Sequence, residues 1–329
     1  MSEQPAILVT GGAGFIGRRV VLRLAQLGLR VTVLDRREDI ALDGLSNDVL
    51  FCSSDLRDRV VIKDLLCEHG SVIHLAAASS FLMYERRPVV ETVNVVESFL
   101  NVLEAARETG STVVYASTSA VYEGNVVPYD EGMQLDPPDQ KALAKKSCEE
   151  FARLYAKRYG MTTIGVRPFS VYGEGEGAKG GYANVVSLFA WAMLAGMRPI
   201  VWGNGEQRRD FIHVDDVASV FVHCALHGTG GRPVINAGTG IETTFNEVIS
   251  LINGELGQNL TPEYVKVGVD IYAQRLQASL ALQKQLGVLP TIPLRAGIRR
   301  VLAYARALST DEARRLASAQ VEHSVLWSK

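Results

Sequence analysis

The first half of the chain alternates short apolar runs with longer amphipathic segments. The apolar runs predict buried strands, at residues 6–9, 30–34, 49–52, 71–75 and 111–117. Helical periodicity marks the segments between them, at residues 15–27, 57–69 and 89–109. Strands that alternate with helices form right-handed βαβ units. The pattern therefore predicts an α/β fold with a doubly wound parallel sheet.

The pattern is less regular after residue 170. The glycine-rich stretch 173–181 predicts a flexible loop that could close over a ligand, and 182–196 predicts a helix. We expect a larger domain and a smaller C-terminal domain, made respectively of residues 1–170 with 211–240 returning to it, and of residues 171–210 with 241–329.

Three spaced glycines follow the first predicted strand: Gly11 and Gly14 precede the first predicted helix, and Gly17 lies in its first turn. Glycines at this spacing turn the chain, let the backbone approach a pyrophosphate, and let strand and helix pack closely. The N-terminus of the following helix favours a bound anion. This stretch predicts a phosphate-binding turn.

Asp35 ends the second predicted strand, 21 residues after Gly14. A carboxylate at this place accepts hydrogen bonds from the adenosine ribose hydroxyls and repels a 2′-phosphate. Together with the glycine turn it predicts a dinucleotide site that prefers NAD to NADP. Arg36 and Arg37, directly after Asp35, keep NADP open as the alternative cofactor.

Ligands of such sheets gather at the carboxyl ends of the strands. That rule collects several predicted strand ends around one crevice, namely Gly11–Gly17, Asp35, Asp55, Ala76–Ala78 and Ser117–Ser119. Asp55 has two interpretations. It could meet the adenine amino group while Leu56 packs on the ring, or it could cap the helix predicted from Arg57.

Composition narrows the classes of function. The net charge of −2 gives no reason to expect nucleic acid or an anionic membrane as a partner. The four cysteines have no C-x-x-C spacing, which argues against a metal site or disulfides and indicates a cytoplasmic location. The first strand begins too early for a signal peptide, and no run of about 18 apolar residues could span a bilayer.

Six stretches carry a resemblance to a known family: TGGAGFIG (10–17), HLAA (74–77), STSAVY (117–122), RPFSVYG (167–173), GNGEQRRDFIHVDDV (203–217) and NAGTG (236–240). They resemble the extended short-chain dehydrogenase/reductase superfamily, and within it the NAD-dependent nucleotide-sugar epimerases and dehydratases. The resemblance implies a Rossmann-type domain that binds NAD, a smaller domain that binds a nucleotide sugar, and no metal.

The resemblance also implies roles for individual residues. NAD is expected at Gly11, Gly14, Phe15, Ile16, Gly17, Asp35, Arg36, Asp55, Leu56, Leu75, Ala76, Ala77, Ser117 and Lys145. The nucleotide sugar is expected at Ser79, Ser119, Ser170, Asn184, Val201, Trp202, Arg209 and Arg275.

The catalytic residues depart from the family pattern. Thr118 and Lys145 match the family's hydroxyl residue and lysine, but the position of its tyrosine base is Lys141. A lysine has a reference pKa of about 10.4, which Lys145, the charged nicotinamide and partial burial would each lower. We expect Lys141 to titrate near neutrality and to act as the acid/base. The alternative is a solvated lysine on a disabled site.

A second departure concerns the Asp-Glu pair with which the family's dehydratases remove water. Ser119 and Ala120 occupy those positions and can do neither step, whereas Glu123 stands where the family has glycine. Glu123 is therefore a candidate for a displaced acid/base, and an exposed loop residue is the alternative.

The chain is thus expected to oxidise C4 of a nucleotide sugar transiently. Without the Asp-Glu pair, return of the hydride to C4 would leave a 5,6-alkene, which resembles the UDP-N-acetylglucosamine 5,6-dehydratases of tunicamycin-type antibiotic pathways. The alternatives are a UDP-sugar 4-epimerase and a non-catalytic NAD-binding protein. Residues 88–110 and 141–160 occupy the segments that form the dimer interface in relatives, so the resemblance implies a homodimer.

Overall fold

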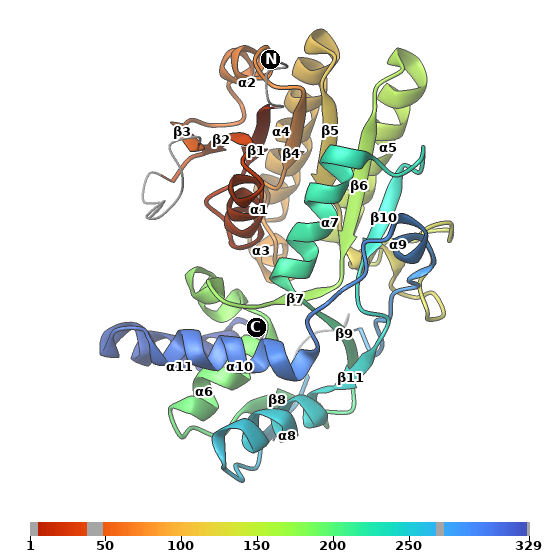
Figure 1. Ribbon diagram of the computed structural model, residues 1–329. Coiled ribbons are helices and arrows are strands. Elements are labelled where there is room, and N and C mark those ends of the chain that lie inside the picture. The colour runs from red at the N-terminus through yellow and green to blue at the C-terminus, as the bar shows by residue number, and fades with distance from the viewer. Residues whose placement is uncertain (1–5, 38–48, 268–272, 328–329) are drawn as a thin grey trace.

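The computed structural model describes residues 6–37, 49–267 and 273–327. Within these residues a seven-stranded sheet, order β10–β6–β5–β4–β1–β2–β3, forms the upper half of Figure 1. The strands are β1 (Ala6–Thr10), β2 (Arg30–Asp35), β3 (Val49–Ser53), β4 (Ser71–His74), β5 (Thr112–Ala116), β6 (Thr163–Pro168) and β10 (Val234–Ala237). Each strand runs parallel to its neighbours, so the predicted α/β fold is confirmed.

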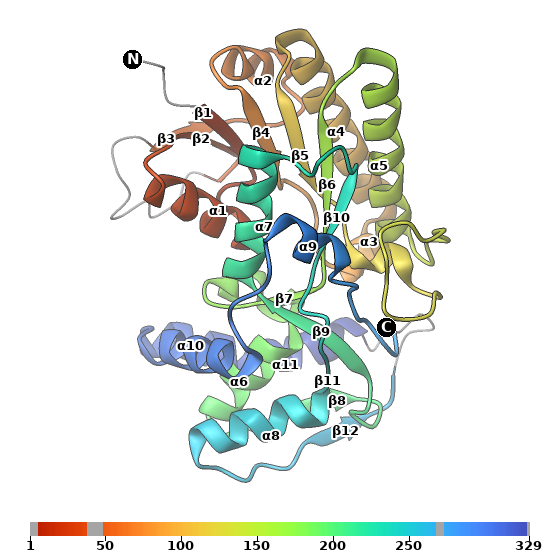
Figure 2. The ribbon, with the colours of Figure 1, turned by 45° about the vertical axis from the view of Figure 1, so that its right-hand side comes forward.

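Helices cover both faces of this sheet. Side chains of a strand alternate between the faces, so Ile7 and Val9 lie in one buried core and Leu8 in another. The first core packs under α1 (Phe15–Gln26) and α7 (Val214–His227). The second packs under α2 (Arg59–Leu66), α4 (Pro88–Thr109) and α5 (Gln140–Tyr159), with the short α3 (Phe81–Arg86) beside α4 (Figure 2).

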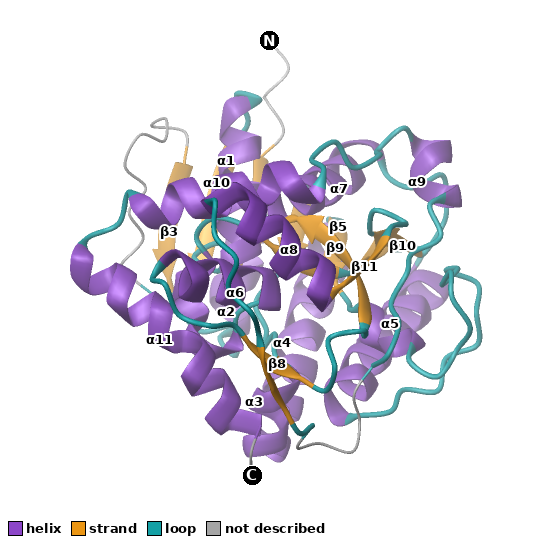
Figure 3. Cartoon of the chain, turned by 90° about the horizontal axis from the view of Figure 1, so that it is seen from below, coloured by secondary structure: helices purple, strands orange, loops and turns teal. Residues whose placement is uncertain are grey.

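The other half contains two small sheets. One joins β7 (Ser170–Tyr172), β9 (Arg208–His213) and β11 (Glu242–Thr244), and the other joins β8 (Ile200–Trp202) and β12 (Glu263–Val265). Figure 3 looks from this side, where helices surround the sheets: α6 (Val185–Leu194), α8 (Phe245–Leu256), α10 (Leu294–Arg306) and α11 (Thr310–Trp327). The short α9 (Ala281–Leu286) instead lies against β10.

The division into two domains stays a prediction. Buried side chains of α6, α8, α10 and α11 form a core of their own, apart from the cores of the large sheet. Leu276, Leu282 and Val288, which the sequence placed with the smaller domain, pack into the core beneath α1 and α7.

Three local features differ from the sequence patterns. Helix α2 begins after Asp58, whose carboxylate accepts from the backbone N–H groups of Val60 and Val61, so Asp55 is not its N-cap. Helix α6 begins only after Asn184. The stretch expected to be a flexible loop forms a 3₁₀ helix, η2 (Glu176–Tyr182), packed against α11.

Gly110, with a φ of 76°, is the C-cap of α4. His74 is buried in β4 and hydrogen-bonded to the Thr10 hydroxyl at 2.8 Å, and its burial and the charge of Lys145 lower its pKa to about 3. None of the helices in the described residues is long and apolar enough to cross a membrane.

Candidate active site at the carboxyl ends of the strands

The sheet reverses its winding between β1 and β4, and the glycine turn lies at the carboxyl end of β1. Gly11 has a φ of 70°, and a Cβ on it would lie 2.5 Å from the Ala76 nitrogen. A Cβ on Gly17 would lie 2.1 Å from the Gly11 oxygen. Such approaches exclude a side chain, so the fold itself requires both glycines.

Gly14 differs from these two. A Cβ there would meet a single neighbour within 4 Å, the Gly11 oxygen at 3.1 Å. Gly14 is also the N-cap of α1, and it offers no side chain to the first N–H groups of the helix. An anion can therefore approach this backbone closely, at the positive end of the helix dipole. The cradle fits the pyrophosphate of a dinucleotide.

Asp35 joins the end of β2 to the glycine turn. Its Oδ2 accepts from the Ala13 nitrogen at 3.0 Å, and its Oδ1 from the Arg37 nitrogen at 3.2 Å. Arg36 beside it has an exposed side chain that approaches Asp55 to 3.8 Å. These contacts bring the residues expected at the adenosine end of NAD to the ends of β2 and β3.

Asp55 is held by Arg57 through hydrogen bonds of 3.0 and 2.7 Å, which lower the pKa of the carboxyl to about 2. The Leu56 side chain packs into the core rather than lying open beside it. At the end of β4, Leu75 and Ala76 are half-buried, whereas Ala77 and Ser79 are exposed.

Lys145 lies at the other side of the crevice, on α5. Its Nζ donates to the Ala116 oxygen of β5 at 2.8 Å, and burial lowers its pKa. Thr118 follows the same strand and accepts from the Ala120 nitrogen at 3.2 Å, as the N-cap of the 3₁₀ helix η1 (Ser119–Tyr122). The strand end thus fixes both residues that match the family pattern.

Lys141 precedes Lys145 by one helical turn and is half-buried. Burial is the largest influence on its amine and lowers its pKa to about 8. The charges of Lys145 and Lys179 act in the same direction, against Asp139 and Glu123. The Lys141 side chain is therefore partly withdrawn from solvent.

Glu123 follows η1 and is half-buried as well. Burial raises the pKa of its carboxyl, Asp139 adds to the effect, and Arg209 and Lys141 oppose it. Glu123 therefore interacts electrostatically with Lys141, the expected acid/base, and with Arg209, the arginine expected at the diphosphate. Ser119, at the start of η1, is buried.

A buried polar network lies behind the catalytic residues. The Ser117 hydroxyl, which was expected at the cofactor, donates to Glu149 Oε1 at 2.6 Å. Arg167 binds the same carboxylate and also donates to the Tyr122 hydroxyl at 2.5 Å. Tyr122 in turn donates to Asn236 Oδ1 at 2.8 Å. The sequence carries no local signal of this network, because its members lie on four separate segments.

Two tyrosines near the candidate site are buried within the protein. Tyr122 is fully buried in the network above, and burial raises its pKa. Tyr84 on α3 is also fully buried with a raised pKa. Lys141 is left as the titratable group at the family's position.

The residues expected at the substrate lie at the edge of the smaller half. Arg209 on β9 is mostly buried and donates to the Arg208 oxygen at 2.9 Å. Ser170, at the start of β7, is half-buried. Val201 and Trp202 of β8 are buried, so their side chains belong to the core. Arg275 is exposed and forms an ion pair with Glu242, 2.9 Å from Nε to Oε1.

Asn184 forms hydrogen bonds through both its side chain and its backbone nitrogen. Its Oδ1 accepts from the Val186 nitrogen at 3.0 Å, and its own nitrogen donates to Glu176 at 3.0 Å. Glu176 is fully buried and also binds Lys179 and Ser187. The many glycines of residues 173–181 predicted a flexible loop, but hydrogen bonds fix its structure. The spacing of Glu176 and Lys179 was the one signal of this in the sequence.

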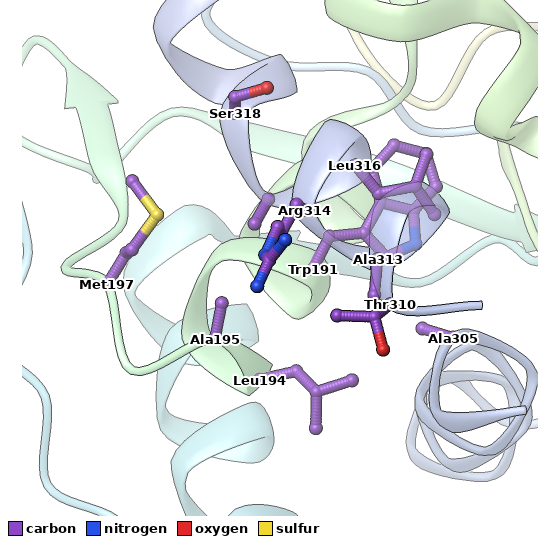
Figure 4. A pocket seen from close by; sticks show the side chains of 11 residues that line it. Trp191, Leu194, Ala195, Met197, Ala305, Thr310, Ala313, Arg314, Leu316 and Ser318 are labelled. Atoms are coloured by element: carbon purple, nitrogen blue, oxygen red, sulfur yellow. The ribbon is translucent and has the colours of Figure 1, made fainter. Parts of the chain in front are cut away.

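A separate cavity lies away from these residues. It has a volume of about 380 Å³ between α6, α10 and α11, and apolar side chains line most of it (Figure 4). None of the predicted site residues is among them. In the described residues no group of His, Cys, Asp or Glu could hold a metal ion.

Comparisons with known proteins agree with this geometry. The model of a family described as the NAD dependent epimerase/dehydratase family matches residues 7–238. UDP-glucose 4-epimerase of Mycolicibacterium smegmatis is 33% identical over 312 residues, which cover 91% of this chain and 98% of that protein.

Two solved structures are similar across nearly the whole chain. UDP-glucose 4-epimerase of Thermotoga maritima, solved with UDP-glucose, has a TM-score of 0.85 and 30% identity, and the match covers 92% of this chain and 98% of that one. TunA, an NAD-dependent NDP-hexosamine 5,6-dehydratase of tunicamycin biosynthesis, has a TM-score of 0.82 and 27% identity. The match covers 94% of this chain and 100% of that one.

Proposed function

The chain belongs to the NAD dependent epimerase/dehydratase family, and from that premise we propose that it is a 5,6-dehydratase of UDP-N-acetylglucosamine. The observation that carries the proposal is a pair of acid/base candidates with opposite pKa shifts. The pKa of Lys141 falls to about 8 while that of Glu123 rises, and each charge influences the other. Two groups whose pKa values are shifted toward neutral pH suit a reaction with two proton transfers.

Lys141 takes the first proton in this proposal. Its neutral amine accepts the proton of the C4 hydroxyl, which Thr118 orients. A base is most effective when its pKa lies near the working pH, and a value of about 8 meets that condition better than an ordinary lysine. The cofactor is NAD, which the glycine turn and Asp35 would hold and which would supply a reversible hydride acceptor for C4.

Glu123 performs the second transfer. The C4 ketone acidifies the proton on C5, which the Glu123 carboxylate removes. The electron pair of the C5–H bond forms the C5=C6 double bond as the C6–O bond breaks, and the proton held by Glu123 joins the departing hydroxide as water. A raised pKa lets one carboxyl both accept and donate this proton.

Arg209 is the proposed partner of the substrate diphosphate. Guanidinium matches phosphate oxygens through two parallel hydrogen bonds. Its charge influences Glu123, which supports a diphosphate bound near the proposed second acid/base. Arg275, paired with Glu242 at the surface, is the weaker candidate for this role.

A UDP-sugar 4-epimerase is the second candidate, favoured by the names of the relatives above. Epimerisation needs the proton transfer at the C4 hydroxyl but no chemistry at C6, so it would leave Glu123 without a role.

Incubation with UDP-N-acetylglucosamine in D₂O separates the candidates. A product lighter by one water, with an alkene at C5–C6 in its NMR spectrum, is the expected result. Inversion at C4 without water loss would establish the epimerase instead. Absence of turnover with NAD still bound would indicate a non-catalytic family member.

We also propose a homodimer, formed by α4 and α5 of two copies. These helices expose Val89 and Val93 on α4 and Leu143 and Leu154 on α5, which are 50–73% accessible. Apolar side chains gathered on neighbouring helices suit burial against a second copy. A cytoplasmic location likewise stays a prediction.

A further inference from the structure

Lys179 lies above the glycine turn, on η2. Its Nζ is 4.6 Å from the centre of the Phe15 ring. Phe15 is the first residue of α1 and directly follows Gly14. A cation from the smaller half of the molecule thus stands over the helix N-terminus that forms the phosphate cradle. Figure 1 shows this segment, in light green, between α1 and α11.

The position of this cation is fixed by buried contacts. Lys179 Nζ donates to Glu176 Oε1 at 2.9 Å, and Glu176 has no exposed surface. The other carboxylate oxygen of Glu176 accepts from the Ser187 hydroxyl at 2.6 Å. A lysine anchored in this way loses less side-chain freedom when it binds a ligand than one that extends into solvent.

Both ends of the segment are fixed as well. Before η2, Glu174 accepts from Arg300 at 2.6 Å and contacts His213 at 2.8 Å. Near its end, the Gly181 nitrogen donates to Glu322 of α11 at 2.9 Å. The backbone that carries Lys179 is therefore tied to β9, α10 and α11.

Lys179 also belongs to a group of cations. Its charge reaches Lys141, as does that of Lys145. Like charges at such range repel, and an anion placed among them relieves the repulsion. Of these cations, Lys179 is the one in contact with Phe15, next to Gly14.

We propose that Lys179 binds a diphosphate group across the mouth of the glycine turn. The two ligands of the proposed function, NAD and the nucleotide sugar, both carry such a group, so this inference rests on that function for its ligands. Contact with Phe15, which directly follows Gly14, favours the cofactor diphosphate. An ammonium group supplies the point charge that phosphate oxygens accept, in addition to the N–H groups of the helix end.

A purely structural role is the alternative, in which Lys179 only neutralises buried Glu176. The two roles differ in what a substitution changes. Lys179→Met would lower thermal stability under either role, but it weakens diphosphate binding only under ours. Lys179→Arg keeps the charge and should retain most of the affinity.

The test is calorimetric titration of nucleotide-free protein with ADP-ribose, AMP, UDP and UMP. For Lys179→Met we expect affinity for ADP-ribose to fall about tenfold or more, the size of a lost charge-assisted hydrogen bond, with AMP affected less. A larger loss for UDP than for UMP would assign the contact to the substrate diphosphate. Lys63→Met removes a lysine paired with Glu108 at 2.7 Å on the remote surface of α2, and should leave every affinity unchanged.

Unchanged affinity for both ADP-ribose and UDP in a folded Lys179→Met protein would overturn the proposal. If that variant does not fold, Lys179→Gln and Lys179→Arg, compared at several salt concentrations, give the same decision through the salt dependence of binding. None of these measurements needs turnover, so failure of the proposed reaction would leave the result readable.

Discussion

Arg167 and Glu149 form a buried ion pair joined by two hydrogen bonds, Nε to Oε1 at 2.8 Å and Nη2 to Oε2 at 2.6 Å. The pair connects β6 to α5, the helix that carries both Lys141 and Lys145. It therefore fixes this helix against the sheet.

Removal of one partner of this pair should be costly. Glu149→Ala leaves the Arg167 charge buried alone, and we expect the free energy of unfolding to fall by about 3–5 kcal/mol in urea denaturation. Glu150→Ala is the matched control, because Glu150 pairs with Lys146 and Arg153 near the surface of the same helix. The control should change stability by less than about 1 kcal/mol. Equal effects would contradict the importance assigned to the buried pair.

Substitution of Lys141 tests its role as the base. Lys141→Ala should reduce kcat by about 10²–10⁴-fold, the usual contribution of a general base. In the unsubstituted protein the amine is active when neutral, so the rate should rise with pH up to about 8 and then level. Lys146→Ala, on the same helix, is the control. Unchanged turnover in Lys141→Ala would exclude the proposed chemistry.

The same residue should make stability depend on pH. The pKa of Lys141 is about 8 in the folded protein and 10.5 ordinarily, so folding disfavours the charged amine. That cost is complete below pH 8 and disappears as the pH rises toward 10.5. Lys141→Met should therefore raise stability at pH 7, by at most about 3 kcal/mol, and much less at pH 10. Thermal unfolding at the two pH values measures the difference; an equal change at both would mean that Lys141 is not desolvated.

Glu123→Gln should separate the two halves of the reaction. The amide cannot take the C5 proton, so oxidation at C4 should persist while water loss falls by about 10²-fold or more. NADH absorbance reports the first step, and mass spectrometry of the product the second. Water loss at the original rate would assign the second transfer to another group.

The two kinds of glycine in the turn should respond differently to alanine. In Gly17→Ala the new Cβ would lie 2.1 Å from backbone, and we expect a loss of both thermal stability and NAD binding. In Gly14→Ala the one close atom is at 3.1 Å, so the fold should persist while NAD affinity decreases. Thermal unfolding and NAD titration of both variants check the contrast, which full NAD affinity in Gly14→Ala would refute.

The sequence predicted the features whose residues lie close together along the chain. Strand, glycine turn, helix and Asp35 follow one another within 30 residues, and each carries its own signal of side-chain type and spacing. The carboxyl-end rule placed Ser117–Ser119, and with them Thr118, at the same crevice, whereas Lys145 was expected there only from the family resemblance. Position along the chain is sufficient for such features.

Other features depend on partners that are remote in sequence. Ser117 appeared to be free for the cofactor because Glu149, its actual acceptor, is 32 residues away. Asp55 resembled a helix cap, but Asp58 forms the cap and Arg57 binds Asp55. The stretch 173–181 looked flexible because its anchors, Arg300 and Glu322, follow more than a hundred residues later.

The contact between Gly181 and α11 has a consequence for the order in which the protein matures. A ribosome synthesises Thr310–Trp327 after every residue of the candidate site, yet Glu322 holds the segment that bears Lys179. The large sheet can fold while the chain is still being synthesised. The segment that bears Lys179, next to the glycine turn, is anchored only after this later helix has been made. Cofactor captured before that point would face an open site, so firm retention of the dinucleotide should begin only after α11 has docked.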